Sequence, residues 1–127
     1  LGKDQGTGNR LDNVHIANNT VTANRGAGVS FATPARPGME AINNIVWNNS
    51  INFGGSPAVS RNNLFTDPQF FDPASDNWSL RAGSPAIDAG TSDGAPSTDY
   101  FGQARCGAAP DIGAIEHCAS IRRRAAR

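Results

Sequence analysis

A histidine and two arginines are the residues of this 127-residue chain whose types could supply a base and cations that bind an anion. Eliminative cleavage beside a uronate carboxyl group needs a base for the neighbouring proton and a cation to neutralise the carboxylate. His15 lies between Val14 and Ile16, so strand alternation directs its side chain out of the core. It is the best base candidate, with Arg25 and Arg61 as weak anion partners. The alternative is a solvent-facing histidine without a chemical role, which we favour because the sequence fixes no partner near it.

Hydrolysis of a glycoside would instead need two carboxyl groups facing one bond. Asp67 and Asp72 each precede a proline, and an Asp-Pro step is typical of a turn in which the carboxylate bonds its own backbone. Asp88 and Asp111 are closely followed by glycine, which again is typical of turns. The sequence therefore indicates turn formation at these acidic residues rather than a catalytic pair.

Calcium is the one cofactor that the acidic residues leave open. The carboxylates of Asp93, Asp99 and Asp111 could bind Ca²⁺, but no loop has the ligand spacing of a recognisable calcium site. We therefore predict no metal site, with Ca²⁺ as the weaker alternative.

Trp47 is the weak candidate for a carbohydrate-binding residue. An outward side chain would offer an aromatic platform on which a sugar ring can stack, and an inward one would belong to the core. Ile42, Ile45, Val46 and Trp47 cannot all point inward, so the sequence leaves both orientations open.

Cys106 and Cys118 are the only cysteines, and they lie twelve residues apart near the end of the chain. They could close a disulfide around the last turn of a secreted protein. The alternative is two unpaired thiols in a reducing compartment, because the sequence does not give the Cα separation that a disulfide requires. A metal pair is disfavoured, since His117 is the only nearby extra ligand and four are normally needed.

The elements that must position these residues are short strands separated by asparagine corners. Many Asn and Gly with only 17% charged residues favour an all-β chain with tight turns over a helical bundle. Asparagine pairs recur in the strings ANNTV, INNIV and RNNLF, at spacings of 25 and 19 residues that indicate stacked repeats. Stacked amides would bond the unit above and below. The predicted corner ladder consists of Asn18, Asn19, Asn43, Asn44, Asn62 and Asn63. The alternative is a set of unrelated hairpin turns in a sandwich.

The pattern becomes irregular after Phe65. Residues 67–118 contain two Asp-Pro steps and several Gly-, Ser- and Pro-rich loops, without a repeat. A stack of repeats has an apolar end that an atypical terminal segment must cover. We expect the covering residues to be the aromatic side chains Phe70, Phe71, Trp78 and Phe101.

With these motifs in view, NVHIANNTVTANRGAGVSF resembles a repeat unit of secreted, mostly bacterial, right-handed parallel β-helix proteins. The segment DPQFFDP…WSLRAGSPAIDAG…DYFGQAR…PDIGAIEH is similar to the choice-of-anchor type of C-terminal module that closes many such helices. The resemblance covers roughly residues 11–117. It implies an all-β, right-handed parallel β-helix of about three coils with an irregular cap, a secreted or cell-surface location and a carbohydrate context.

The chain divides accordingly into β-helix coils (residues 1–66), a cap segment (67–118) and a basic, disordered tail (119–127). We expect a structural or carbohydrate-binding C-terminal fragment of a longer protein, without a complete active site of its own. The first alternative is part of a polysaccharide lyase or glycoside hydrolase whose catalytic coils precede residue 1. The second is an adhesin-like module that associates edge to edge through an open N-terminal coil.

The formal net charge of zero hides an asymmetry. Four of the eleven cations lie in the last six residues, and the rest of the chain has 7 Lys and Arg against 11 Asp and Glu. An acidic body argues against nucleic acid as a partner. A polysaccharide is the partner that the resemblance allows. No apolar run approaches the length of a membrane span, and we expect any signal peptide to lie outside this chain.

Overall fold

Short β-strands build the described part of the chain. The computed structural model describes residues 12–31 and 34–118, and within them it contains nine strands, one 3-10 turn and no α-helix. The strands are β1 (His15–Ala17), β2 (Thr20–Thr22), β3 (Ala27–Ser30), β4 (Glu40–Ile42), β5 (Ile45–Trp47), β6 (Ile51–Gly54), β7 (Val59–Arg61), β8 (Phe70–Asp72) and β9 (Asn77–Leu80), and the 3-10 turn is η1 (Pro73–Ser75). The predicted all-β class is confirmed. The predicted basic tail (119–127) lies outside the described residues.

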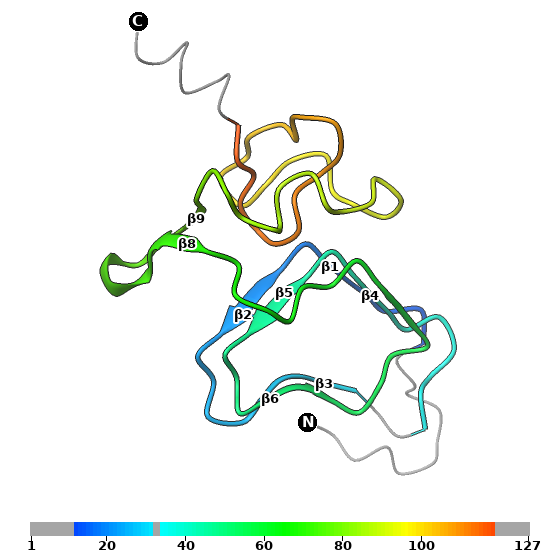
Figure 1. The fold of residues 1–127 in the computed structure, drawn as a ribbon. Coiled ribbons are helices and arrows are strands. Elements are labelled where there is room, and N and C mark those ends of the chain that lie inside the picture. Colours follow the sequence, from blue (N-terminus) through cyan, green and yellow to red (C-terminus); the bar gives the residue numbers. More distant parts are fainter. Residues whose placement is uncertain (1–11, 32–33, 119–127) are drawn as a thin grey trace, which may run out of the picture.

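The first seven strands pair in parallel between successive repeats. One sheet has the order β1-β4-β7, and two further ladders join β2 to β5 and β3 to β6 (Figure 1). The first repeat (β1 to β3) pairs with the second (β4 to β6), and the third repeat begins with β7. His15 is opposite Glu40 and Thr20 is opposite Ile45, which is the 25-residue offset of the asparagine pairs, whereas Val29 is opposite Phe53 at an offset of 24. The sheets are short and separate, and the finer right-handed β-helix stays a prediction.

The interior of the stacked repeats contains a row of aromatic rings and a point at which β3 and β5 lie close together. Phe31, Phe53 and Phe65 form an edge-to-face row with 4.9 Å between neighbouring ring centroids. Val46 of β5 is fully buried and faces Gly28 of β3, where a Cβ atom would come within 2.9 Å of the valine side chain. A glycine at this position therefore lets β3 approach β5 closely.

Neighbouring residues of β5 point to opposite faces, which decides the orientation that the sequence left open. Val46 points into the interior, whereas Ile45 is equally buried but packs against Ala86 and Ile112 of the cap segment. Strand alternation then directs Trp47 to the same outer face as Ile45.

The second residues of the asparagine pairs form a continuous amide ladder. Asn44 Oδ1 accepts hydrogen bonds from the backbone N–H and from Nδ2 of Asn19, at 3.0 and 3.1 Å. Asn63 Oδ1 accepts the same two bonds from Asn44, both at 3.0 Å. Asn44 is completely buried, so these bonds satisfy groups that would otherwise be costly to remove from water.

A second ladder, which the sequence analysis missed, lies at the next corner. Asn49 Oδ1 accepts from the backbone N–H and Nδ2 of Asn24, at 3.0 and 2.9 Å. The preceding residues, Ala23 and Asn48, have positive φ values of 62° and 57°. The ladder at this corner was not predicted because alanine stands where the other repeat has the first asparagine.

The cap segment lies along the first corner, above β1 and β4 in the view of Figure 1. There the first residue of each asparagine pair has left-handed φ and turns its amide outward, a conformation that asparagine tolerates. These amides donate to backbone carbonyl groups of the cap segment: Asn18 Nδ2 to Asp111 O (3.0 Å), Asn43 Nδ2 to Thr91 O (2.8 Å) and Asn62 Nδ2 to Ala89 O (3.0 Å). The cap segment is thus fastened to the flank of all three repeats.

The expectation that four aromatic side chains cover the end of the stack is wrong. Phe71 and Phe101 are 52% and 69% exposed, and Phe65 at the end of the interior row is 39% exposed. Amide hydrogen bonds and the outward faces of Ile42 and Ile45 hold the cap segment at the corner instead. No helix in the described ranges is long and apolar enough to cross a membrane.

Candidate functional site

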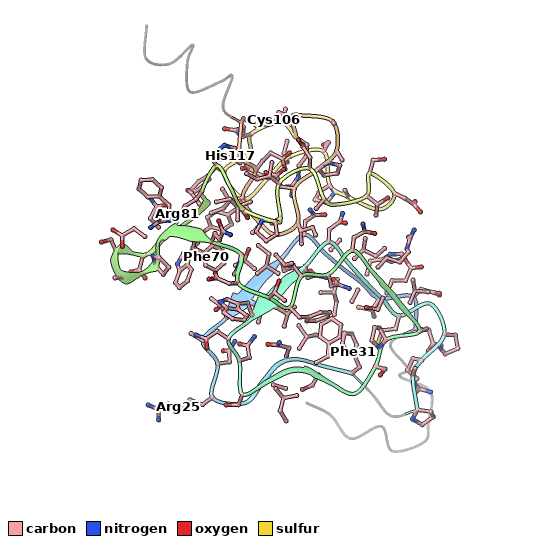
Figure 2. All side chains as sticks on the ribbon, in the orientation of Figure 1. Arg25, Phe31, Phe70, Arg81, Cys106 and His117 are labelled. Atoms are coloured by element: carbon pink, nitrogen blue, oxygen red, sulfur yellow. A yellow bond between two sulfur atoms is a disulfide. The ribbon has the colours of Figure 1, made fainter. Side chains whose placement is uncertain are left out.

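A β-hairpin after the third repeat carries an aromatic pair. β8 and β9 are antiparallel and are joined through η1 and Asp76, whose φ is 56°. Phe70 and Trp78 pack edge to face, with 5.3 Å between ring centroids. Phe70 and Leu80 are buried against Ile45, which anchors the base of the hairpin (Figure 2). The Trp78 ring is therefore held in place while remaining partly exposed.

A loop of the cap segment presents a second aromatic pair. Buried Asp99 accepts the backbone N–H groups of Phe101 and Gln103 on one carboxylate oxygen, both at 2.9 Å. The Tyr100 N–H donates to Ala114 O at 2.8 Å. The rings of Tyr100 and Phe101 are in edge contact, yet these residues are 77% and 69% exposed. A fixed backbone thus holds two large rings out in solvent.

Hairpin and loop border a cleft of about 620 Å³ beside β2, here called the aromatic cleft. Its apolar surface comes from Trp78, Tyr100, Phe101, Ala114 and Ile115, and its polar surface from Thr20, Thr22, Asp76, Asn77 and Ser79. Thr20 Oγ1 accepts the Ala114 N–H at 3.0 Å, which joins β2 to the opposite wall. Pockets that combine aromatic side chains with a few polar groups are typical of small-molecule sites.

The aromatic cleft carries little charge. Among the described residues that line it, Asp76 is the only ionisable carboxylate, and there is no arginine or histidine. An anionic ligand would meet no cation among these residues. The lining suits an uncharged ligand that has apolar faces and hydroxyl groups.

A second cleft, of about 450 Å³, lies on the other side of the Phe70 and Trp78 pair and is here called the Trp47 cleft. It is lined by Trp47, Asp67, Gln69, Phe70, Pro73 and Arg81. Trp47 points outward from β5 and packs partly against the cluster that contains Phe70. The outward orientation is the one in which the indole offers a surface for a ligand.

The two charges of the Trp47 cleft are held by local bonds. Arg81 donates from Nε to Phe70 O at 3.0 Å and from Nη2 to Phe71 O at 2.9 Å, and its guanidinium lies 5.9 Å from the centre of the Phe71 ring (Figure 2). Asp67 accepts the Gln69 N–H at 2.9 Å. Because one cation and one carboxylate line the cleft, it has no net formal charge.

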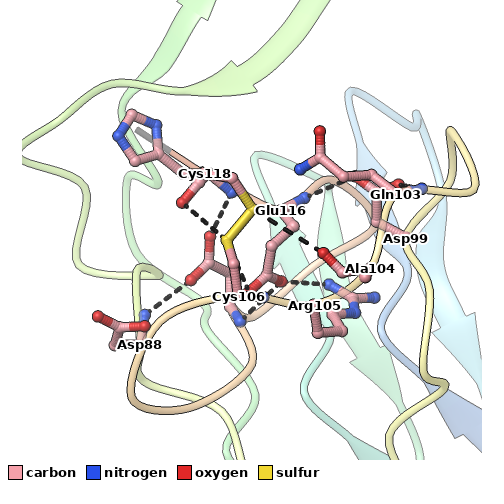
Figure 3. The surroundings of a disulfide bond; sticks show 10 residues. Asp88, Asp99, Gln103, Ala104, Arg105, Cys106, Glu116 and Cys118 are labelled. Atoms are coloured by element: carbon pink, nitrogen blue, oxygen red, sulfur yellow. Dashed lines mark hydrogen bonds and ion pairs between the residues drawn. A yellow bond between two sulfur atoms is a disulfide. The ribbon is translucent and has the colours of Figure 1, made fainter. Parts of the chain in front are cut away.

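Buried carboxylates, rather than strand pairing, fix the backbone of the loop that carries Tyr100 and Phe101, here called the aromatic loop. Glu116 accepts from Arg105 Nη1 at 2.7 Å, from the Cys106 N–H at 3.2 Å and from the Asp111 N–H at 3.0 Å (Figure 3). The Glu116 N–H donates in turn to Asp99 Oδ2 at 3.1 Å. The carboxylate that shapes the aromatic loop is thus bonded to the buried ion pair behind it.

Asp111 is the carboxyl group that this environment perturbs. It is 1% exposed and accepts the N–H groups of Asp88 and His117, at 2.8 and 2.6 Å. Burial raises the pKa of Asp111 above its usual value; the two backbone bonds act in the opposite direction, and the negative charges of Glu116 and Asp88 add to the increase.

Cys106 and Cys118 form a disulfide, with 5.9 Å between their Cα atoms (Figure 3). The covalent link closes a loop that contains Asp111 and Glu116. It therefore restrains the segment whose carboxylates support the aromatic loop.

His15 lies on the exposed face of β1 as strand alternation predicts, with a partner that the sequence did not reveal. Its Nδ1 lies 3.0 Å from Glu40 Oε2, and its side chain is 60% exposed. The signal was available in principle, because the 25-residue repeat places Glu40 opposite His15.

The structure places the two candidate arginines in different surroundings. Arg61 on β7 pairs with Asp93 at 3.1 Å, and Arg25 lies exposed between β2 and β3, directed away from the body in Figure 2. His15 and Arg61 belong to the outer strands of one three-stranded sheet, so about 12 Å separates their backbones. The arrangement does not bring a base and a cation to one point.

The three candidate calcium ligands also have separate partners. Asp93 pairs with Arg61, while Asp99 and Asp111 accept backbone N–H groups of the cap segment. Among residues 12–31 and 34–118, no group of three or more His, Cys, Asp or Glu side chains is arranged to hold a metal ion.

Sequence reasoning missed Tyr100 and assigned Trp78 and Phe101 to the end of the stack. The available signal was the pair Tyr100-Phe101 directly after Asp99 and before Gly102, which is typical of an exposed turn. Comparison of the chain with protein-family models, with curated proteins and with solved structures found no match. The site is therefore interpreted from its own geometry.

Proposed function

We propose that this chain is the C-terminal part of a right-handed parallel β-helix protein, secreted or on the cell surface, and that its aromatic cleft binds a neutral carbohydrate. The observation that carries the proposal is the pair Tyr100 and Phe101, held exposed beside Trp78 by a rigid backbone. In this reading the repeats are the scaffold and the cap segment supplies the binding surface.

The β-helix part of the proposal is supported by two regularities. Three sets of strands pair in parallel from one repeat to the next, and asparagine ladders run through two corners. Repeats that contact only their neighbours are typical of solenoids. The disulfide between Cys106 and Cys118 supports an oxidising location such as the cell exterior.

The carbohydrate part rests on the composition and rigidity of the aromatic cleft. Sugar rings present apolar C–H faces that pack on aromatic rings, and hydroxyl groups that pair with polar side chains. Trp78 and Tyr100 supply the first kind of surface, while Thr22 and Asn77 supply the second. Exposed rings on a fixed backbone lose little conformational entropy when a ligand covers them.

Binding is favoured over cleavage because the aromatic cleft offers one carboxylate. Hydrolysis of a glycosidic bond needs two carboxyl groups facing that bond, and eliminative cleavage needs a base with a cation for the uronate. Among the described residues that line the cleft, Asp76 is the only carboxylate, and the base candidate named from the sequence, His15, lies on a different sheet.

Isothermal titration calorimetry and affinity electrophoresis against a panel of soluble polysaccharides test the proposal. The panel contains neutral β-glucan, xylan and galactomannan, together with anionic polygalacturonate and cationic chitosan. We expect binding to at least one neutral polymer and about tenfold or greater loss in Tyr100→Ala, because an exposed aromatic ring that lines the cleft is removed.

Phe71→Ala is the matched control. Phe71 is 52% exposed, like the cleft aromatics, but it lines neither cleft. Its removal should leave the affinity unchanged. Absence of binding to every neutral polymer, or equal losses in both variants, would contradict the proposal.

A further inference from the structure

The two clefts share a boundary, which raises the question of whether they serve one ligand. Thr22 lines the aromatic cleft, and its register partner on the neighbouring strand, Trp47, lines the Trp47 cleft. Trp78 lines the first cleft and Phe70, its edge-to-face partner, lines the second. The clefts are therefore adjacent both along the β2–β5 ladder and across the hairpin.

We propose that the aromatic cleft and the Trp47 cleft are consecutive subsites for one extended neutral glycan chain, which passes from one cleft to the other at the Phe70 and Trp78 pair. This inference rests on the proposed function and adds the form of the ligand, an internal stretch of a polymer rather than a single sugar. Neighbouring strands lie about 4.8 Å apart, a distance comparable with the length of one sugar residue.

The chemistry of the Trp47 cleft matches that of its neighbour. Trp47 offers an aromatic face, while Asp67 and Gln69 offer exposed hydrogen-bonding groups for hydroxyls. Arg81 and Asp67 balance in charge, so an uncharged chain can continue from one cleft into the other without a change in ligand class.

Two adjacent clefts suit a polymer better than a single sugar, because one chain can occupy both. The two clefts, of about 620 and 450 Å³, are each bordered by few residues, so one cleft contacts only a short stretch of a chain. Two such sites on one rigid body bind a single chain with a gain in affinity, because the second contact is intramolecular once the first has formed.

The chain contains two tryptophans, Trp47 and Trp78, so each cleft reports through one indole N–H signal. Two-dimensional ¹H–¹⁵N NMR of the disulfide-bonded protein, with signals assigned from Trp47→Phe and Trp78→Phe, follows both clefts at once. The titrants are fragments of the polymer that binds best in the panel, of increasing length.

Short fragments of about two or three sugars should shift the Trp78 signal alone, and fragments of about six should shift both signals and bind about tenfold more tightly. Trp47→Phe should reduce this gain with length and leave the affinity for short fragments within about twofold. A Trp47 signal that stays fixed while long fragments saturate Trp78 would overturn the two-subsite inference and leave the proposed function intact. If no polymer of the panel moves either signal, the proposed function itself fails.

Discussion

Asp111 and Glu116, two buried acidic residues, are joined by a hydrogen bond in which the backbone N–H of Asp111 donates to Glu116 Oε2 at 3.0 Å. Each carboxylate accepts further backbone N–H groups, and Arg105 supplies a cation to Glu116 alone. The cap segment thus obtains from two side chains the backbone pairing that strands would otherwise provide. Changes to these carboxylates should therefore affect folding strongly.

Glu116→Gln should lower the free energy of unfolding by about 3–5 kcal/mol, because Arg105, whose side chain is 10% exposed, loses its partner in a buried site. Urea denaturation followed by fluorescence measures the change. Asp93→Asn, which breaks the exposed ion pair with Arg61, is the matched control and should cost less than about 1 kcal/mol. Similar losses in both variants would contradict a special role for the buried pair.

The raised pKa of Asp111 predicts a pH dependence with a defined sign. The fold favours the protonated carboxyl, so this contribution to stability is complete below the unfolded-state value of 3.8 and is lost as the pH rises through the raised folded-state pKa. Asp111→Asn lacks this titration. The stability of the wild type relative to the variant should therefore increase on acidification from about pH 7 to about pH 4.5. A difference that is constant over this interval would refute the assignment.

Ala23 occupies a left-handed position that other corners give to asparagine. Its φ of 62° is costly for a side chain with a Cβ atom, whereas the equivalent Asn48 tolerates φ of 57°. Ala23→Gly should raise the free energy of unfolding by about 1 kcal/mol, measured by thermal or urea denaturation. Ala82→Gly, at an exposed position without positive φ, should be neutral or destabilising. Equal effects at both positions would exclude the strain at Ala23 as the cause.

Asn44, in the middle of the first amide ladder, should contribute more to stability than Asn24, an exposed member of the second ladder. Asn44 is fully buried and bonds to Asn19, Asn63 and Ile16 O, so Asn44→Ala leaves several polar groups without partners and should cost about 3 kcal/mol or more. Asn24→Ala, at an exposed position of the second ladder, should cost about 1 kcal/mol. Urea denaturation curves of the two variants give the loss in free energy of unfolding for each. A larger loss for Asn24→Ala would show that burial does not determine how much a ladder asparagine contributes to stability.

The repeats could be predicted from the sequence more completely than the cap segment and the aromatic cleft. The spacings of the asparagine pairs match the 25- and 19-residue separations of the ladder bonds, because stacked amides force one residue type to recur. Asn24 and Asn49 escaped the same reasoning, since no apolar residue follows both at a shared offset.

The position of the cap segment could not be predicted in the same way. It depends on which backbone carbonyl groups accept the bonds from Asn18 and Asn43 and on carboxylates such as Asp99, and these residues of the cap segment recur with no period in the sequence. The aromatic cleft was missed for a related reason. Large rings are expected to be buried, and the turn signal around Asp99 and Gly102 was weaker than this expectation, whereas the backbone bonds to Asp99 show that Tyr100 and Phe101 are held outward.

The attachment of the cap segment to Asn18, Asn43 and Asn62 has a consequence for how the stack comes apart. A stack in which each repeat touches only its neighbours can fray from its ends, one repeat at a time. Here the first repeat cannot detach without also breaking its bond to Asp111, and the third cannot detach without releasing Ala89. Because the cap segment is bonded to all three repeats, we expect the repeats to unfold together in one cooperative step rather than one at a time.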